Sequence, residues 1–322
     1  MKPLVIVTRK LPASVELRMK ELFNVRLNGD DKVFTQEDLI AAVKEAHVLV
    51  TTVTDKISWD VLSKVAPDLK MIANYGVGVD HIDLVSARNK GITVTNTPGV
   101  LTEDTADMAM LLILGITRRM SEGEKILRAG MWKIWSPTGM LGMRLRDKNL
   151  GIIGMGRIGQ ALALRAKTFG LNIHYHNRQK IDDGLEKNIG ATYWTSLDQM
   201  ITQMDIISLN CSSTPDTRHI MSRRRIGLMK KNAYLINTTR GDVVDEDALI
   251  WALEEEIIAG VGLDVYKNEP NINPRLLNFD NALLTPHMGS ATDEARIAMG
   301  EKVIMNVKIF LDGHSPRDRV LA

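Results

Sequence analysis

The sequence contains only one cysteine, Cys211, so no disulfide bond can form within the chain. A single thiol suits a reducing compartment. Long apolar runs are missing too, because the longest, from Ala106 to Ile116, has about half the length that a membrane-spanning helix needs. The apolar segment from Met1 to Val7 is too short for a signal-peptide core and has no cleavage site. We therefore expect a cytoplasmic protein without a membrane partner.

An excess of charge of one sign is also absent, because 41 lysines and arginines oppose 39 aspartates and glutamates. The longest basic cluster, Arg223–Arg225, is followed by Lys230 and Lys231. This stretch is typical of the solvated face of a short helix between two strands, so we predict no nucleic-acid partner. We also predict no bound metal. With 44% hydrophobic and 25% charged residues, the composition is that of an ordinary globular protein.

Short apolar runs alternate with helix-length segments along the chain, which indicates an α/β protein with parallel sheets and crossover helices. The predicted strands are residues 4–8, 48–52, 69–74, 92–95, 150–153, 172–176, 205–210, 234–237, 260–264 and 282–284. Helical patterns include residues 36–46 and 59–65, a long helix at 102–129 and a last one at 291–311. A chain of 322 residues exceeds the usual size of one core, so we expect two doubly wound domains, one inserted in the other.

A glycine motif opens the second series of strands and helices. Gly154, Gly156 and Gly159 form G-x-G-x-x-G directly after a predicted strand and at the start of a helix. The first glycine permits a tight turn, the second lets the backbone approach a pyrophosphate, and the third lets the helix pack on the strand. The N–H groups at the helix start attract phosphate. We predict a dinucleotide-binding loop made of Gly154, Met155, Gly156, Arg157, Ile158 and Gly159.

The strand that follows this motif ends without a carboxylate. An NAD-type site usually has Asp or Glu there to hold the ribose 2′-hydroxyl. Here the strand runs into Asn177, Arg178 and Lys180. A guanidinium matches a 2′-phosphate in charge and geometry, so we predict that these three residues bind the cofactor. The pattern favours NADP(H), and NAD(H) remains possible.

Three chemically versatile residues each follow a predicted strand of the second half. They are Arg240, Glu269 and His287, and ligands of open parallel sheets bind at these carboxyl ends. Histidine suits proton transfer near neutral pH, and a carboxylate partner orients its ring and favours its charged form. Arginine can hold a substrate carboxylate and polarise a carbonyl. The set predicts a catalytic site for carbonyl reduction.

With these motifs, the chain resembles the D-isomer-specific 2-hydroxyacid dehydrogenase family, and most closely its glyoxylate/hydroxypyruvate reductase branch. The matching segments are residues 74–83, 96–102, 154–159, 237–241, 264–270 and 286–292. The resemblance implies hydride transfer from NAD(P)H to a small 2-keto acid, which gives the D-2-hydroxy acid.

The same resemblance implies a domain organisation. Residues 1–98 and 289–322 would form a flavodoxin-like substrate-binding and catalytic domain, and residues 99–288 an inserted dinucleotide-binding Rossmann domain. Family members are typically homodimers, so we expect a homodimer. Trp135 is the candidate for a tryptophan that reaches the neighbouring subunit's site.

Residue roles also follow from the resemblance. His287 would be the acid/base, Glu269 its partner and Arg240 the substrate anchor, while backbone N–H groups at Val77 and Gly78 would bind the substrate carboxylate, as a glycine-rich loop can. Further implied cofactor contacts are Thr105, Cys211, Thr238, Thr239, Asp264 and Gly289, with Asp264 at the nicotinamide carboxamide. Ser290 completes the predicted substrate contacts.

The sequence departs from the family pattern at three places. Thr239 stands where Ala or Ser is usual before the arginine. Ser212 replaces a proline that often follows the cysteine, which affects the expected shape of the adenosine-side loop. The Asn177–Arg178 ending is similar to that of NADP-using members. Cys211 itself is interpreted as a small apolar residue at the cofactor cleft, because no histidine pairing is indicated.

Two alternatives remain open. The same scaffold could take another substrate, as phosphoglycerate, formate and phosphite dehydrogenases do. A larger anionic substrate would favour extra basic residues near the glycine loop, and residues 74–83 contain none. The second alternative is a dinucleotide-sensing corepressor similar to the C-terminal-binding proteins, which also carry the Arg–Glu–His set. The lack of a disordered tail after the last predicted helix argues against it.

Overall fold

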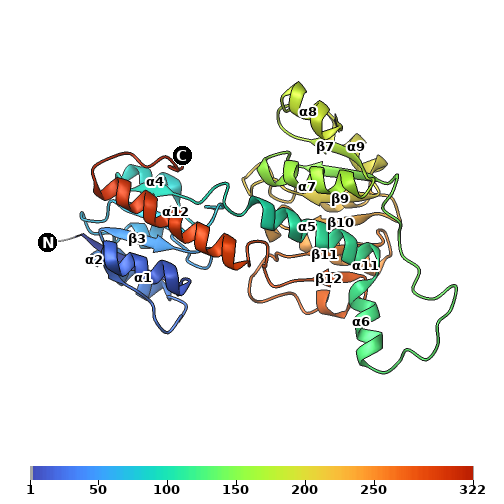
Figure 1. The fold of residues 1–322 in the computed structure, drawn as a ribbon, viewed down its shortest axis with the longest axis horizontal. Coiled ribbons are helices and arrows are strands. Elements are labelled where there is room, and N and C mark those ends of the chain that lie inside the picture. Colours follow the sequence, from blue (N-terminus) through green and yellow to red (C-terminus); the bar gives the residue numbers. More distant parts are fainter. Residues whose placement is uncertain (1–2, 322) are drawn as a thin grey trace. The chain divides into compact units, whose positions relative to one another are not determined.

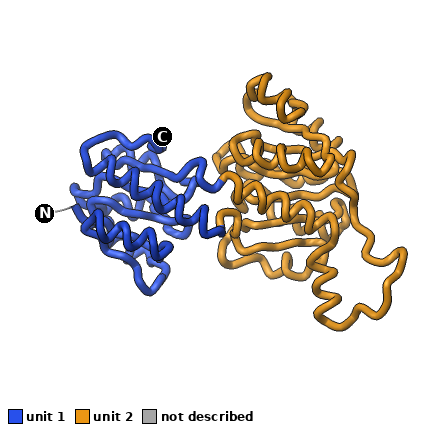
Figure 2. The backbone as a smooth tube through the Cα atoms, viewed as in Figure 1, with its two compact units in different colours: residues 1–101, 291–322 blue, residues 102–290 orange. Residues whose placement is uncertain are grey.

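The structure is a computed structural model that describes residues 3–321. The chain divides into two compact units (Figure 2). Unit 1 consists of residues 1–101 and 291–322, and unit 2 consists of residues 102–290. The boundaries at 101/102 and 290/291 lie a few residues beyond the predicted 98/99 and 288/289.

Unit 1 contains one parallel sheet with the strand order β2-β1-β3-β4-β5, which is the flavodoxin-like order. Its strands are β1 (Leu4–Val7), β2 (Asn24–Arg26), β3 (Val48–Thr51), β4 (Met71–Asn74) and β5 (Thr93–Thr95). Its helices are α1 (Ala13–Leu22), α2 (Gln36–Glu45), α3 (Trp59–Leu62), α4 (Leu84–Asn89) and α12 (Asp293–Leu311). Every residue of β3 and β4 is buried, as expected for parallel strands with helices on both faces.

Unit 2 contains a seven-stranded parallel sheet in the order β12-β11-β10-β9-β6-β7-β8. Its strands are β6 (Asn149–Ile153), β7 (Asn172–His176), β8 (Ala191–Tyr193), β9 (Ile206–Leu209), β10 (Tyr234–Asn237), β11 (Gly260–Leu263) and β12 (Ala282–Leu284). The direction of winding reverses between β6 and β9, as in a Rossmann fold with one added strand. The predicted fold class is confirmed.

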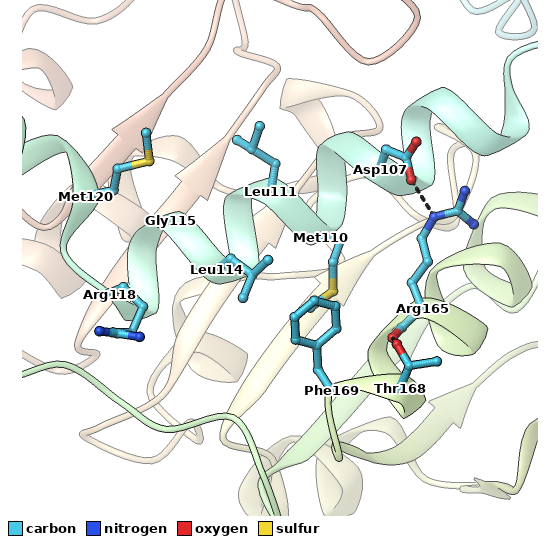
Figure 3. A pocket seen from close by; sticks show the side chains of 10 residues that line it. All are labelled: Asp107, Met110, Leu111, Leu114, Gly115, Arg118, Met120, Arg165, Thr168 and Phe169. Atoms are coloured by element: carbon cyan, nitrogen blue, oxygen red, sulfur yellow. Dashed lines mark hydrogen bonds and ion pairs between the residues drawn. The ribbon is translucent and has the colours of Figure 1, made fainter.

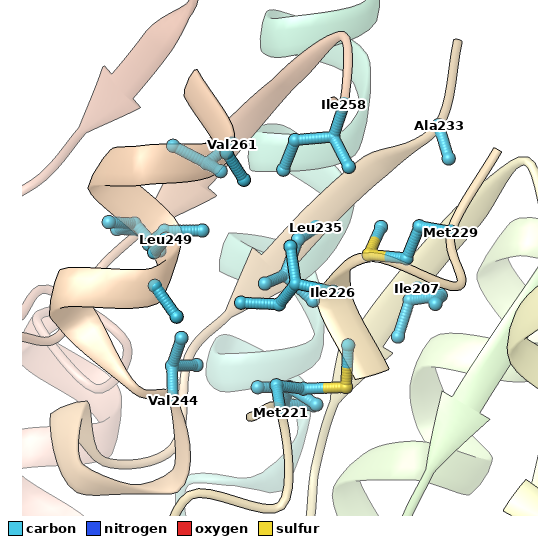
Figure 4. Close-up of a cluster of buried hydrophobic side chains, with 14 of the residues drawn as sticks. Ile207, Met221, Ile226, Met229, Ala233, Leu235, Val244, Leu249, Ile258 and Val261 are labelled. Carbon is cyan, nitrogen blue, oxygen red and sulfur yellow. The ribbon is translucent and has the colours of Figure 1, made fainter. Parts of the chain in front are cut away.

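Helices cover both faces of the unit 2 sheet. They are α5 (Thr102–Thr117), α6 (Met120–Arg128), α7 (Arg157–Thr168), α8 (Asp183–Ile189), α9 (Leu197–Gln203), α10 (Arg223–Ile226) and α11 (Glu246–Glu254), with short 3-10 turns η1 (Gly241–Val243) and η2 (Leu276–Asn278). On one face α5 packs beside α7 (Figure 1). On the other face Leu249 of α11 and Ile226 of α10 pack over Leu235 and Val261 of the strands (Figure 4).

The basic cluster lies on α10, the short helix between β9 and β10, as predicted. The carboxylate of Asp198 on α9 pairs with Arg224 and Arg225, each at 2.8 Å. These two hydrogen bonds lower the pKa of Asp198 to about 2. The guanidinium of Arg223 lies 3.8 Å from the ring centre of Trp251. All three arginines of the cluster therefore contact side chains of unit 2.

The prediction of one long helix over residues 102–129 is wrong, because the structure has two helices there, α5 and α6. The Thr117 hydroxyl donates to the Ile113 carbonyl at 2.7 Å, and the Thr117 carbonyl accepts the N–H of Met143 at 2.8 Å. The Thr117 carbonyl therefore accepts a hydrogen bond from outside the helix instead of one from the next helical turn. Arg119 follows with a left-handed φ of 55°, which ends the helical path.

Two strands, β2 and β8, are missing from the sequence-based prediction. Each is three residues long and lies at the edge of its sheet, and neither contains a fully buried residue. Such strands give no apolar run or regular alternation to detect. Over residues 3–321, no helix has the combination of length and apolar character that would let it cross a membrane.

Two helical glycines, Gly300 in unit 1 and Gly123 in unit 2, differ in how closely their helices are packed. A Cβ added at Gly300 in α12 would lie 3.0 Å from the Cβ of buried Val15 and closer to its methyl groups, whereas one at Gly123 in α6 would meet only Met140, at 3.8 Å. We predict that Gly300→Ala destabilises the protein by about 1–3 kcal/mol, despite a gain in helix propensity of up to about 1 kcal/mol. Gly123→Ala should be neutral or stabilising. Urea denaturation midpoints measure both, and equal midpoints for the two variants would refute the prediction.

Candidate active site

The glycine loop lies where the strand order of unit 2 reverses, between the carboxyl ends of β6 and β9. Gly154 follows β6 with a φ of +97°, a conformation that favours glycine. A Cβ there would lie 2.6 Å from the backbone nitrogen of Cys211, which follows β9. Both the backbone conformation and the contact therefore require glycine at this turn.

The start of α7 is open to a ligand. A Cβ at Gly159 would overlap the carbonyl oxygen of Gly154, so this glycine lets the helix approach its own strand. A Cβ at Gly156, in contrast, would have no atom within 4 Å. Gly156 caps the helix without a side-chain hydrogen bond, and within residues 3–321 the N–H groups of Arg157 and Ile158 have no acceptor. Unpaired N–H groups at a helix start form an anion site.

The cationic residues after β7 differ in their surroundings. Lys180 donates to Asp183 at 2.7 Å and lies 3.3 Å from Glu186. Arg178 is exposed and makes no hydrogen bond or ion pair with the residues that the structure describes. The amide of Asn177 donates to the Gln179 carbonyl at 3.0 Å. Of the two cations, Arg178 is the one available to a ligand.

Two buried polar atoms beside the loop lack partners among residues 3–321: Oδ1 of Asn210, after β9, and Oγ1 of Thr238, after β10. Unsatisfied buried polar atoms are rare in folded proteins, where a bound water, an ion or a functional role usually accounts for them. Together with the open space at Gly156, they fit a polar cofactor along this edge of the sheet. Burial raises the pKa of the neighbouring Cys211 thiol to about 11, which keeps this thiol uncharged at neutral pH.

Glu269 and His287 form a hydrogen-bonded pair. Nδ1 of His287 lies 2.6 Å from Oε2 of Glu269, and Oε1 accepts the N–H of Tyr266 at 2.9 Å. Burial alone would raise the pKa of the Glu269 carboxyl. The hydrogen bond and charge of His287, the Tyr266 N–H and the charge of Arg240 outweigh that effect and lower the pKa below 4.5. Glu269 is therefore an anion at neutral pH, and Nε2 of His287 makes no hydrogen bond with residues 3–321.

The turn that carries His287 is held by the buried carboxylate of Asp264. Its Oδ1 accepts the Thr285 hydroxyl at 2.6 Å and the Met288 N–H at 2.7 Å, and its Oδ2 accepts the Gly289 N–H at 2.7 Å. Burial, the largest influence, raises the pKa of this carboxyl despite these hydrogen bonds. His287 adopts a left-handed φ of 54° within the turn.

Arg240 follows β10 in a loop shaped by Asn237. The Asn237 amide donates to the Arg240 carbonyl at 2.8 Å, while its oxygen accepts the N–H and hydroxyl of Thr239 at 3.0 and 2.9 Å. A Cβ at Gly241 would overlap the peptide between Tyr266 and Lys267. The Arg240 loop therefore touches the segment that leads to Glu269.

The structure thus brings together Arg240, Glu269 and His287, which all belong to unit 2. Thr105 of α5 joins them, because its hydroxyl donates to the Gly289 carbonyl at 3.1 Å, and Ser290 ends the unit. Val77 and Gly78 lie in unit 1, in the loop after β4. Sequence reasoning did not single out Tyr266, although its position between Asp264 and Glu269 was a signal.

Comparisons with known proteins show which proteins this chain is similar to. Residues 110–289 match the model of the D-isomer specific 2-hydroxyacid dehydrogenase, NAD binding domain. A glyoxylate reductase from Thermococcus litoralis is 45% identical over 99% of this chain and 97% of that protein.

Solved structures give the same result. A glyoxylate reductase from Paecilomyes thermophila has a TM-score of 0.88 and 32% identity over 99% of this chain and 98% of that one. An NADPH-dependent glyoxylate/hydroxypyruvate reductase from Sinorhizobium meliloti was solved in complex with NADP and malonate. It has a TM-score of 0.88 and 33% identity, over 99% of this chain and 97% of that one. The chain belongs to the D-isomer specific 2-hydroxyacid dehydrogenase family and is an enzyme that uses a nicotinamide dinucleotide.

Proposed function

We propose that this enzyme reduces glyoxylate, hydroxypyruvate or a similarly small 2-keto acid to the D-2-hydroxy acid. The observation that carries the proposal is the 2.6 Å hydrogen bond between His287 and Glu269 on the loops that follow β11 and β12. Relatives named glyoxylate reductase that match almost the whole chain support this substrate class.

The proposed chemistry divides between the cofactor and the protein. A nicotinamide dinucleotide, which the glycine loop from Gly154 to Gly159 would hold, would supply the hydride for the carbonyl carbon. His287 donates a proton from Nε2 to the carbonyl oxygen as negative charge develops there. Glu269 holds Nδ1 and so orients the ring. Arg240 binds the substrate carboxylate and polarises the carbonyl.

Unit 1 supplies the second carboxylate contact in this proposal. The N–H groups of Val77 and Gly78 bind the substrate carboxylate, because consecutive N–H groups form an anion-binding concavity. The acidic side chain of Asp80 and the absence of Lys or Arg between residues 74 and 83 favour a small substrate without a second anionic group.

The favoured cofactor is NADPH, with the glycine loop from Gly154 to Gly159 at its pyrophosphate. Arg178 is the proposed 2′-phosphate ligand, since it is exposed and has no partner in the described part of the chain. Asn210 and Thr238 offer the buried polar atoms that a dinucleotide would complete.

We also propose a cytoplasmic homodimer. None of the α6 residues is buried, and every residue from Leu127 to Gly142 is exposed, including Trp132 at 61% and Trp135 at 73%.

A cavity of about 650 Å³ lies at α5 and α7, where Met110, Leu114 and Phe169 point into it (Figure 3). Apolar surface of this extent is typical of an interface, and a second copy of the chain is the proposed partner.

The first prediction concerns turnover. The wild-type protein is expected to oxidise NADPH when glyoxylate or hydroxypyruvate is present. His287→Ala should lower kcat by about 10²–10⁴-fold, because the proton donor is removed. The exposed residue His314 provides a control, and His314→Ala should leave kcat unchanged. Absence of turnover of any keto acid by the wild type, or an unchanged kcat in His287→Ala, would contradict the proposal.

The second prediction concerns the charge of Glu269. Its lowered pKa means that the pair with His287 persists above pH 4.5 and is lost as the pH falls through the lowered value. In His287→Ala the hydrogen bond that opposes burial is gone, so the pKa of Glu269 should rise. Carbon-13 NMR titration of the glutamate carboxyl groups measures the change. An unmoved Glu269 pKa would show that His287 does not hold this carboxylate in its charged form.

The third prediction separates the two cations after β7. Arg178→Ser should raise the Kd of NADPH by about tenfold or more, since it removes a charge-assisted contact, while the Kd of NADH changes little. Lys180→Ser is the matched control and should have the smaller effect, because Lys180 is already paired with Asp183. Fluorescence titration of both reduced dinucleotides measures these constants. Equal losses for NADPH and NADH in Arg178→Ser would eliminate the 2′-phosphate contact.

A further inference from the structure

The loop after β4 has two chemically different sides. On one side, the N–H groups of Val77, Gly78 and Val79 donate to no acceptor within residues 3–321. Val77 is 36% exposed and Gly78 and Val79 are partly exposed, so these donors lie at the protein surface. Three successive N–H groups without partners are the components of an anion-binding concavity.

On the other side, side-chain amides hold every carbonyl oxygen from residue 76 to residue 78. The Asn74 amide donates to the carbonyl of Gly76 at 3.0 Å and to that of Gly78 at 2.9 Å. The Asn96 amide, after β5, donates to the carbonyl of Val77 at 2.8 Å. In a trans peptide the C=O and N–H bonds point in opposite directions, so a held carbonyl fixes the direction of the next N–H.

The Asn74 amide is itself held in one orientation. Its oxygen accepts a hydrogen bond from Nε2 of His81 at 3.0 Å and lies 3.4 Å from the Thr51 hydroxyl. Asn74 is the last residue of β4 and is 1% exposed, which excludes solvent as a competing partner. With the oxygen engaged, the nitrogen must face the two loop carbonyls.

We propose that Asn74 is a positioning residue that directs the N–H groups of Val77, Gly78 and Val79 at the substrate carboxylate, with Asn96 as its partner. The inference deepens the proposed function, on which it rests for the identity of the anion. Asn74 acts through the loop backbone and does not touch the substrate.

The chemistry requires an amide at this position. Aspartate has the same shape but would place a carboxylate oxygen against the carbonyls of Gly76 and Gly78, which repels both. The other oxygen could still accept from His81. Asn74→Asp therefore changes the direction of the loop peptides with little change in side-chain volume.

Direct binding is the decisive experiment, and the probe is oxalate, a small dicarboxylate that cannot be reduced by hydride transfer. Amide NMR signals of Val77, Gly78 and Val79 are followed during oxalate titration of the full-length protein saturated with NADP⁺. We expect these signals to shift in the wild type. In Asn74→Asp the Kd of oxalate should rise by about tenfold or more, and in Asn96→Ala by a smaller factor.

Kinetics separates positioning from general loss of structure. The KM of glyoxylate should rise in Asn74→Asp, while kcat changes by less and the Kd of NADPH is unchanged. The KM of methyl glyoxylate, which has no carboxylate, should not rise. Asn28→Ala is the matched control, because its amide also donates to two backbone carbonyls of unit 1, those of Thr8 and Lys32, and it should leave both KM values unchanged.

The outcomes are distinguishable. The proposal is overturned if oxalate leaves the three amide signals of the wild type unmoved, or if both asparagine variants bind oxalate as tightly as the wild type. A parallel rise in KM for glyoxylate and its ester would also overturn it, since that would indicate a structural role alone. Oxalate binding that depends on Asn74, in a protein that reduces no keto acid, would support the positioning role and reject the proposed function. Asn96→Ala keeps the test valid if Asn74→Asp does not fold.

Discussion

The buried carboxylate of Asp264 connects the loops on which the active site depends. Its backbone N–H donates to the carbonyl of Asn237, the last residue of β10, and its carbonyl accepts the N–H of His287 after β12. The side chain holds Met288 and Gly289, and Gly289 in turn accepts the hydroxyl of Thr105 on α5. One residue therefore aligns three neighbouring strand ends and a helix. The raised pKa of the Asp264 carboxyl reflects the energetic cost of burying this charged group.

Much of the fold was predictable, because parallel strands buried on both faces leave continuous apolar runs in the sequence. The glycine spacing at Gly154 likewise predicted a turn whose φ and contacts the structure confirms. The break at Arg119 was not predictable, since it depends on the N–H of Met143, 26 residues from the Thr117 carbonyl that it reaches. Contacts of this kind leave no periodic signal.

The candidate site was predictable to a similar degree. Arg240, Glu269 and His287 were expected at strand ends, and the structure places all three there. Sequence alone treated Arg178 and Lys180 as equals, whereas the start of α8 supplies Asp183 and Glu186 to Lys180 only. The resemblance assigns Asp264 to the cofactor, whereas in the structure its carboxylate accepts hydrogen bonds from Thr285 and Met288 of the turn. The pairing of Lys180 and the hydrogen bonds of Asp264 depend on partners that a sequence motif does not identify.

The nested order of the two units has a consequence for synthesis of the chain. The five strands of unit 1 are complete by residue 95, but α12, which packs on β4 and against Val15 of α1, begins only at residue 293. At about 5–20 residues per second, the ribosome needs roughly 10–40 s to make the intervening unit 2. During that time the nascent sheet of unit 1 lacks one of its covering helices, and its apolar face is exposed to chaperones or to neighbouring chains. Unit 2 has all its strands and helices in one continuous segment, so it can finish folding first, although it is made second.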